Sequence, residues 1–335
     1  MKFKRLITTI DAHTEGEAVR LVTGGIPNIP GKTMQKKREF FMENLDYLRS
    51  ALVDEPRGHE AMFVVVMTPP VTDDAAFGVI FMMSPKHYPD MCGHGSIGTA
   101  TIAVEMGIVE AKEPITEVVF NTPTGTIHTR VSVENGKAKS VTIQNIPCFL
   151  YKSAVVKVPG LGELPVDISF GGNFYAIVKA KDIGIKTEAD EISRHADLFA
   201  QIKKSINEQV EIQHPEMDFV KGVEVFIIHD KPRNPKANIL NIAYVGPGKN
   251  MDRSPCGTGT SATMAALHAK GELGLGDIYV TESITGSLFQ GKLIKEAKVG
   301  DYNAVIPEIT GRAFIMGINN IVLDEDDPFK YGFRL

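Results

Sequence analysis

The chain has 335 residues, of which 43% are hydrophobic, and its formal net charge is −5. This length allows two domains of ordinary size, each with a hydrophobic core of its own. The 36 basic and 41 acidic residues are intermingled, so the sequence offers neither a basic stripe for nucleic acid nor a polybasic arm for a membrane surface. We therefore expect a small-molecule partner, no nucleic acid and no membrane.

The N-terminus, MKFKRLITTIDAH, starts like a secretory signal, but Asp11 interrupts its apolar run too early for one. The longest apolar runs, such as residues 61–67, have the length of strands and fall far short of the roughly 20 residues that span a bilayer. The three cysteines contain no CxxC pair, and their odd number argues against a disulfide framework or a cysteine-rich zinc site. These features predict a cytoplasmic protein with reduced thiols.

Short runs rich in Val, Ile and Phe, bounded by Pro, Gly or Asp, predict strands along the chain. They lie at residues 5–11, 62–68, 77–83, 117–120, 140–143, 223–229 and 239–245. Helical spacing of Leu, Ile and Phe, with mixed charge on the opposite side, predicts helices at residues 34–52 and 188–209. The expected fold class is α/β, in the broad sense that includes α+β.

The chain also contains an internal repeat centred on two of its cysteines. Cys92 and Cys256 are each followed by glycine at positions +1, +3 and +15, namely Gly93, Gly95 and Gly107 in the first copy and Gly257, Gly259 and Gly271 in the second. Farther along, TGTI at residues 124–127 matches TGSL at residues 285–288. Each copy is interpreted as a mostly buried helix with a glycine C-cap. The repeat predicts two similar domains related by a pseudo-twofold axis.

The glycine frames distinguish two of the cysteines from the third. Buried free cysteine is a common small core residue, and Cys148, which lacks such a frame, is interpreted that way. A thiol at a strand-to-helix turn needs nearby glycines if the backbone amides must approach a ligand closely. The free N–H groups and dipole of a helix N-terminus can lower the pKa of a thiol and bind a carboxylate. Cys92 and Cys256 are therefore candidate functional thiols.

Two such turns facing each other would hold one carboxylate between two thiols, which is a geometry for racemisation. One thiolate removes the Cα proton from one face, and a thiol on the other face delivers a proton. One cysteine must then be ionised and the other protonated, so the two titrate as a coupled pair. Activity should rise and then fall with pH.

Several motifs carry a family resemblance. The motifs MCGHGSIG and DRSPCGTGT, together with DAHTEGE, EPRGHEAMF, SFGGNFYAIV, PEITGRAF and DPFKYGF, resemble the proline racemase family, which includes hydroxyproline 2-epimerases. The resemblance covers essentially the whole chain. It implies an isomerase that works without a cofactor and consists of two domains similar in fold to diaminopimelate epimerase.

The resemblance also implies how the domains are arranged. Residues 1–148 plus 308–335 would form the first domain, which carries Cys92, and residues 149–307 the second, which carries Cys256. Each domain would be a curved sheet or barrel around a central helix that begins at its cysteine. The active site would lie in the cleft between the domains, and closure of that cleft would shield the thiols from water. The family resemblance implies a homodimer.

Residue by residue, the resemblance assigns Cys92 and Cys256 as the catalytic acid and base. The family's carboxylate site corresponds to the backbone amides of four residues, Gly93, His94, Gly257 and Thr258. Its contacts with the substrate's ring nitrogen correspond to Asp252 and the side chain of His94. A protonated ring nitrogen beside the carboxylate makes the Cα proton more acidic.

The wall of the pocket decides the substrate. Family members that prefer proline line the ring site with phenylalanines, and two of these correspond to Phe63 and Phe81. A third corresponds to the region of Val245, where the loop at residues 246–251 is one residue longer and the smaller side chain leaves room beside the ring. Since the two phenylalanines offer no partner for a hydroxyl, we predict proline as the main substrate. Epimerisation of 4-hydroxyproline is the alternative, alone or as a second activity.

Other functions are less well matched by the sequence. Family members with threonine in place of the second cysteine dehydrate trans-3-hydroxyproline, whereas this chain keeps Cys256. A cysteine hydrolase would leave the second cysteine turn unexplained, and a non-catalytic amino-acid binder would leave both thiols unused. A redox switch through a disulfide is compatible with catalysis, because oxidation would inactivate the racemase.

Three further motifs are open to more than one interpretation. The CxH spacing of Cys92 and His94 is a weak zinc signal, so no metal is expected. The stretch at residues 13–16, HTEG, could be functional or could hold a turn. For His59, in EPRGHEA, the structural interpretation is favoured.

Overall fold

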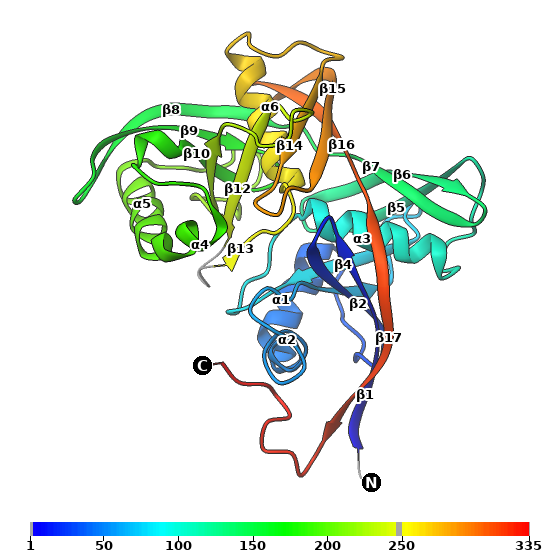
Figure 1. The fold of residues 1–335 in the computed structure, drawn as a ribbon. Helices are drawn as coiled ribbons and strands as arrows, with labels where there is room; N and C mark the ends of the chain where they lie inside the picture. The colour runs from blue at the N-terminus through cyan, green and yellow to red at the C-terminus, as the bar shows by residue number, and fades with distance from the viewer. Residues whose placement is uncertain (1–2, 246–249, 335) are drawn as a thin grey trace. The chain divides into compact units, whose positions relative to one another are not determined.

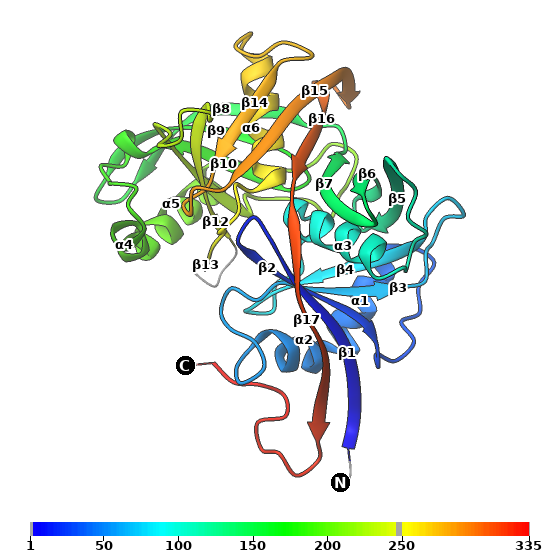
Figure 2. The same ribbon diagram turned by 45° about the vertical axis from the view of Figure 1, so that its right-hand side comes forward.

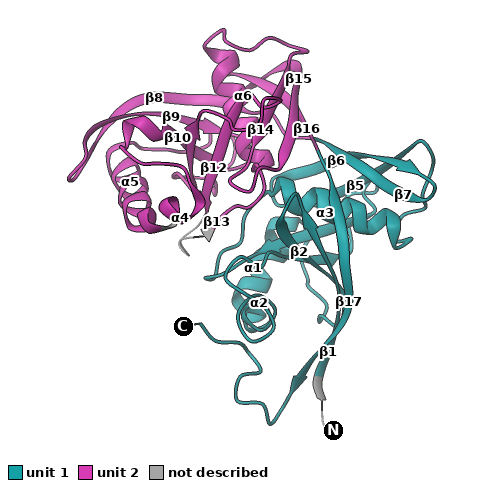
Figure 3. Ribbon diagram, viewed as in Figure 1, with its two compact units in different colours: residues 1–143, 311–335 teal, residues 144–310 magenta. Residues whose placement is uncertain are grey.

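The computed structural model describes residues 3–245 and 250–334 (Figure 1). The chain forms two compact units, shown in different colours in Figure 3. Unit 1 comprises Met1–Ile143 and Gly311–Leu335, and unit 2 comprises Gln144–Thr310. In both units a sheet is packed around one long buried helix, so the fold is mixed α and β as the sequence predicts. No helix within the described ranges is long and apolar enough to cross a membrane.

Unit 1 is built from eight strands and three helices of the described chain. The strands are β1 (Phe3–Thr14), β2 (Glu17–Gly24), β3 (Val64–Thr68), β4 (Phe77–Met82), β5 (Ile115–Thr122), β6 (Gly125–Glu134), β7 (Lys137–Gln144) and β17 (Ala313–Asp324). The helices are α1 (Met34–Asn44), α2 (Asp46–Val53) and α3 (Gly93–Glu105). Helix α3 contacts β1, β2 and β17, and it is buried on all sides from Gly93 to Val104. Such a helix needs apolar or small residues around its whole circumference.

Unit 2 repeats this plan. Its strands are β8 (Phe149–Val158), β9 (Gly162–Phe170), β10 (Phe174–Lys179), β11 (Val225–Asp230), β12 (Ile239–Val245), β13 (Asn250–Met251), β14 (Ile278–Glu282), β15 (Leu288–Val299) and β16 (Tyr302–Gly311). Its helical segments are α4 (Ala189–Ile192), α5 (Ala196–Gln209), α6 (Gly257–Ala269) and the short 3-10 turns η1 (Ala180–Asp182) and η2 (Ser193–His195). Helix α6 occupies the place that α3 has in unit 1, and it contacts β8, β9, β10 and β15.

The strand pairing shows that the two units share one topology. In unit 1 the order is β17, β1, β2, β3, β4, β5, β6, with pairings that are antiparallel, antiparallel, parallel, antiparallel, parallel and antiparallel. In unit 2 the order β8, β9, β10, β11, β12, β14, β15 follows the same succession. The pairing of β1 with β17 brings the first and last strands of the chain side by side (Figure 1, Figure 2). The prediction of two similar domains is confirmed.

The glycines of the repeat have the conformations that their positions require. Gly107 and Gly271 follow α3 and α6 with φ of 68° and 73°, in the left-handed region that ends a helix. Gly125 and Gly286 lie in the turns that connect β5 to β6 and β14 to β15, with φ of 135° and 85°. Both predicted glycine C-caps are therefore confirmed, and the second matching stretch lies at equivalent hairpins of the two units.

Two predicted helices differ from the structure. The helix expected at residues 34–52 is two helices, because Leu45 leaves the helical conformation with φ −128° and ψ 10°. Asp46 then starts α2, where its carboxylate accepts hydrogen bonds from Arg49 and from the hydroxyl of Tyr88. The helix expected at residues 188–209 is interrupted by η2. Tyr88 is distant in sequence from Asp46, so this contact leaves no local signal in the chain.

Candidate active site

Cys92 is the N-cap residue of α3. Its backbone is extended, with φ −146° and ψ 120°, and its Sγ accepts a hydrogen bond from the Gly95 N–H at 3.4 Å. The side chain of His94 lies beside the thiol, with Nδ1 3.3 Å from Sγ. Both residues are buried. The first turn of α3 thus places a thiol, an imidazole and the backbone amides of Gly93 and His94 at one helix N-terminus.

Two aromatic rings pack against this turn. Phe63 contacts the His94 ring at 4.5 Å between centroids, and Phe81 lies 5.7 Å from Phe63. A Cβ atom at Gly95 would approach Phe63 to 2.8 Å and Phe81 to 3.2 Å, so only glycine allows the rings to lie this close. The structure therefore brings together, within unit 1, the predicted residues Cys92, His94, Phe63 and Phe81.

Cys256 precedes α6 in unit 2, but its backbone differs from that of Cys92. Its φ is 61° and its ψ is 93°, a left-handed conformation that is uncommon for any residue other than glycine. The Cys256 N–H donates to the Ser254 hydroxyl at 3.2 Å, and the Ser254 N–H donates to the Asp252 carboxylate at 2.8 Å. The Asp252 N–H in turn donates to the Ala243 carbonyl of β12. Predicted residues Asp252, Cys256, Gly257 and Thr258 thus share one turn.

A tyrosine that the sequence analysis did not select also contacts this turn. The hydroxyl of Tyr175, on β10, lies 2.5 Å from the Thr258 hydroxyl and 3.9 Å from the Cys256 sulfur. Tyr175 is buried, and burial, together with the nearby Cys256, raises its pKa well above the usual value. Its motif, SFGGNFYAIV, carries a family resemblance, but nothing in the local sequence shows that Tyr175 points toward Cys256.

The protonation of Cys256 departs from the expectation for a helix N-terminus. Burial, followed by the charge of Asp252, raises the pKa of the thiol far above its usual value. The Gly259 N–H and the Tyr175 hydroxyl act in the opposite direction but do not compensate. Desolvation in this structure therefore outweighs the stabilisation of a thiolate by the α6 N-terminus, and it favours the protonated form of Cys256.

Val245 ends β12 and is half-buried against an apolar cluster. The cluster comprises Tyr175, Ile177, Val225, Ile227, Ala243, Cys256 and Ala262. Residues 246–249 of the predicted longer loop lie outside the described residues. The structure thus packs Val245 against the apolar cluster that includes Cys256.

The remaining motifs have structural partners. Glu15 (φ 46°) and Gly16 (φ 97°) form the turn between β1 and β2, and the Gly16 N–H donates to Nδ1 of His13. The Thr14 hydroxyl donates to the His94 carbonyl at 2.8 Å, which supports the first turn of α3. His59 accepts a hydrogen bond from the Ala61 N–H, in keeping with a structural role.

Cys148 lies in the core. Its sulfur donates to the Ile146 carbonyl at 3.1 Å, and burial raises the pKa of the thiol far above its usual value. All three cysteines are free thiols. The core interpretation of Cys148 agrees with this environment.

The comparisons with known proteins identify the family. Residues 9–334 match the family model described as proline racemase. The chain is 52% identical to the proline racemase of Clostridioides difficile and 43% identical to a 4-hydroxyproline 2-epimerase of Streptosporangium roseum, with all of both chains covered in each case. Its structure is similar to that of a hydroxyproline epimerase from Agrobacterium vitis with bound trans-4-hydroxy-L-proline, with TM-score 0.92 and 33% identity over 100% of this chain and 97% of that chain.

The fold of two similar mixed α and β domains, together with the match to racemases and epimerases, makes this protein an isomerase. The chain belongs to the proline racemase family.

Proposed function

We propose that this protein interconverts L-proline and D-proline with two cysteines as acid and base. The observation that carries the proposal is the repeated site: each unit places a buried cysteine at the N-terminus of its central helix, in a glycine-rich turn. A reaction that inverts one carbon needs one proton-transfer group on each face of that carbon. The family membership of the chain agrees with such a reaction.

The chemistry balances without any other reactant. One thiolate removes the Cα proton, and the opposing thiol donates its proton to the other face of the same carbon. Each turnover exchanges which cysteine is protonated, so the free enzyme alternates between two forms. Because the substrate's own atoms and the two thiols account for every proton, we propose a reaction that needs no cofactor.

The substrate's charged groups have matching partners in the proposed site. We assign the carboxylate to the amides of Gly93 and His94 and to those of Gly257 and Thr258, at the positive ends of two helix dipoles. The ring ammonium is assigned to Asp252, whose carboxylate is buried at the second turn. Each unit supplies one half of this site, and we propose that the two halves bind the same substrate molecule in a cleft that closes on it.

We propose proline as the main substrate because the walls beside Cys92 are apolar. Phe63 and Phe81 are both buried, and neither offers a hydrogen-bond partner to a ring hydroxyl. An unpaired hydroxyl in such a pocket loses its bonds to water. Epimerisation of 4-hydroxyproline is the second candidate, favoured by the small side chain of Val245 in the other wall. Dehydration of trans-3-hydroxyproline is the weakest, since Cys256 is present.

The cellular setting follows from two further observations. We propose a cytoplasmic location, because the three free thiols suit a reducing compartment.

We also propose a homodimer. Strand β17 exposes an alternating apolar row, Phe314, Met316 and Ile318, the last two 60% and 63% exposed, and contiguous apolar surface of this kind marks association sites.

The test is an incubation of the reduced protein with L-proline in D₂O, followed by polarimetry and by the α-proton signal in NMR. Loss of optical rotation together with deuterium at Cα supports the proposal. Deuterium without loss of rotation would mean that only one thiol acts on proline. Matched incubations with trans-4-hydroxy-L-proline decide between the two substrates, and a strong preference for hydroxyproline would refute the argument from Phe63 and Phe81.

A further inference from the structure

Two polar side chains behind the Cys256 turn are not part of the proposed substrate site. His229 on β11 and Asn241 on β12 are directly opposite each other in an antiparallel pair, so their side chains lie on the same face of the sheet. Nε2 of His229 lies 2.8 Å from Oδ1 of Asn241. Asn241 has no exposed surface, and a buried amide of this kind must have its hydrogen bonds satisfied.

Asn241 reaches the residue that precedes the cysteine. Its Nδ2 donates to the Pro255 carbonyl at 2.8 Å, and a second, longer bond to that carbonyl comes from the Thr260 hydroxyl at 3.4 Å. The Pro255 carbonyl belongs to the peptide unit that joins Pro255 to Cys256. A hydrogen bond to this oxygen therefore fixes the plane of the peptide that enters the left-handed Cys256.

We propose that Asn241 is a positioning residue for the Cys256 thiol and that His229 holds Asn241 in the required orientation. This inference rests on the proposed function of Cys256. The Cys256 backbone is strained, with φ 61°, whereas Cys92 has an ordinary extended backbone. A strained conformation persists only where surrounding contacts fix it. The hydrogen bond from Asn241 supplies such a contact at Cys256. The extended backbone of Cys92 is not strained in this way.

The direction of each hydrogen bond follows from the acceptors. The Pro255 carbonyl can only accept, so the Asn241 amide must turn its NH₂ group toward it and its oxygen toward His229. That oxygen also can only accept, so His229 must carry its proton on Nε2. Burial lowers the pKa of His229 to about 4, which keeps the ring neutral at pH 7. The neutral ring with a proton on Nε2 therefore holds Asn241.

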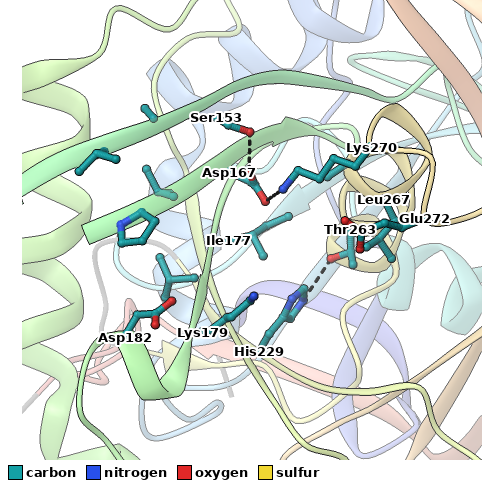
Figure 4. Close-up of a pocket in the computed structure, with 16 residues that line it drawn as sticks. Ser153, Asp167, Ile177, Lys179, Asp182, His229, Thr263, Leu267, Lys270 and Glu272 are labelled. Atoms are coloured by element: carbon teal, nitrogen blue, oxygen red, sulfur yellow. Dashed lines mark hydrogen bonds and ion pairs between the residues drawn. The ribbon is translucent and has the colours of Figure 1, made fainter. Parts of the chain in front are cut away.

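His229 is accessible from outside the proposed substrate site. It lines a surface cavity of about 520 Å³ in unit 2, together with residues of β8, β9, β10 and the second half of α6. Figure 4 shows Thr263 of α6 bonded to the His229 ring, and an ion pair between Asp167 and Lys270 on the same wall. Lys179 and Asp182 also line the cavity. Small molecules can thus reach His229, which begins the hydrogen-bond chain through Asn241 to Pro255, without entering the site at Cys256.

The test uses variants of His229, which is half-buried and more tolerant of change than Asn241. His229→Leu removes the N–H donor, whereas His229→Gln keeps a donor close to the position of Nε2. Asp182→Asn, in the same cavity, is the matched control. We expect His229→Leu to lower kcat by roughly 10- to 100-fold, as for a reacting group displaced by up to about 1 Å. His229→Gln and Asp182→Asn should stay within about threefold of the original kcat, a change near one weak hydrogen bond.

A second readout does not depend on the substrate. The rates at which iodoacetamide alkylates Cys92 and Cys256, measured by peptide mass spectrometry, should change in their ratio by at least about threefold in His229→Leu and remain unchanged in His229→Gln. The ratio, unlike thermal stability, reports the local position of one thiol. Imidazole added to His229→Ala should enter the cavity and restore part of kcat and the original ratio.

The outcomes separate this inference from the proposed function. If the original protein does not racemise proline, the proposed function fails, and the alkylation ratio still tests the positioning role. If His229→Leu leaves both kcat and the alkylation ratio unchanged while it folds, the inference is overturned. It is also overturned if His229→Gln and His229→Leu lose the same activity, because the retained donor would then make no difference.

Discussion

Gly259 lies three residues after Cys256, and its replacement by alanine should displace the second thiol without unfolding the protein. An added Cβ would lie 2.9 Å from the Cys256 sulfur and 2.7 Å from Cδ1 of Ile227. Both atoms are the ends of side chains that can rotate. Ordinary contacts between such atoms begin at about 3.5 Å, so the sulfur must retreat by at least about 0.6 Å.

This displacement sets the expected effect on the rate. A misplacement of about 1 Å costs on the order of 100-fold, so a retreat of about 0.6 to 1 Å should lower kcat by roughly 10- to 100-fold, or about 1.4 to 2.7 kcal/mol of activation free energy. Alanine also favours the helical backbone by up to about 1 kcal/mol. The variant should therefore fold with little loss of stability.

The assay is polarimetry of proline racemisation, with thermal unfolding as the measure of folding. Gly317→Ala is the matched control, because a Cβ there would meet only the Asn319 side chain at 3.7 Å, an ordinary contact. If Gly259→Ala folds and keeps more than about half of the original kcat, the reasoning from thiol position is refuted.

Three further changes follow from the described contacts. Tyr175→Phe should lower kcat/KM by roughly tenfold in steady-state assays, because the Thr258 hydroxyl loses a buried partner worth up to about 1.5 kcal/mol; an unchanged value would contradict the role of Tyr175. Burial raises the pKa of the Cys148 thiol. The contribution of this shift to the free energy of unfolding is therefore present below about pH 8.5, the usual thiol pKa, and is lost as the pH rises. In urea unfolding between pH 8.5 and 10.5, the free energy of unfolding should fall less steeply for Cys148→Ala than for the original protein. Burial lowers the pKa of His229 to about 4, so the contribution of this shift to the free energy of unfolding is present above about pH 6.5 and is lost as the pH falls toward 4. Between pH 6.5 and 4, the free energy of unfolding measured with urea should therefore fall less steeply for His229→Gln than for the original protein. An equally steep fall would contradict this assignment.

The sequence predicted those parts of the site that depend on local spacing. Glycines at fixed distances from Cys92 and Cys256 are visible in the chain itself, because a turn that brings backbone amides close to a ligand tolerates no side chain there. The same repeat predicted both central helices and their glycine C-caps. Family resemblance then predicted the phenylalanines beside Cys92.

The remaining parts depend on contacts between distant strands. Tyr175 and Asn241 reach the Cys256 turn only through the register of β10, β11 and β12, and no local pattern specifies which side chain a strand turns toward a helix N-terminus. The left-handed backbone of Cys256 is equally hidden, because the surrounding hydrogen bonds impose it. The raised pKa of Cys256 follows mainly from burial, which outweighs the helix N-terminus that the sequence does reveal.

The central claim is that two thiols act together on one carbon. Cys92→Ser and Cys256→Ser, each made alone and tested for racemisation of both enantiomers of proline, address it most directly, with Cys148→Ser as the control. The account predicts that each of the first two variants loses at least about 100-fold in kcat for both enantiomers, as expected when a general acid or base is removed, while the control remains active. Racemisation that survives in either single variant would contradict the account.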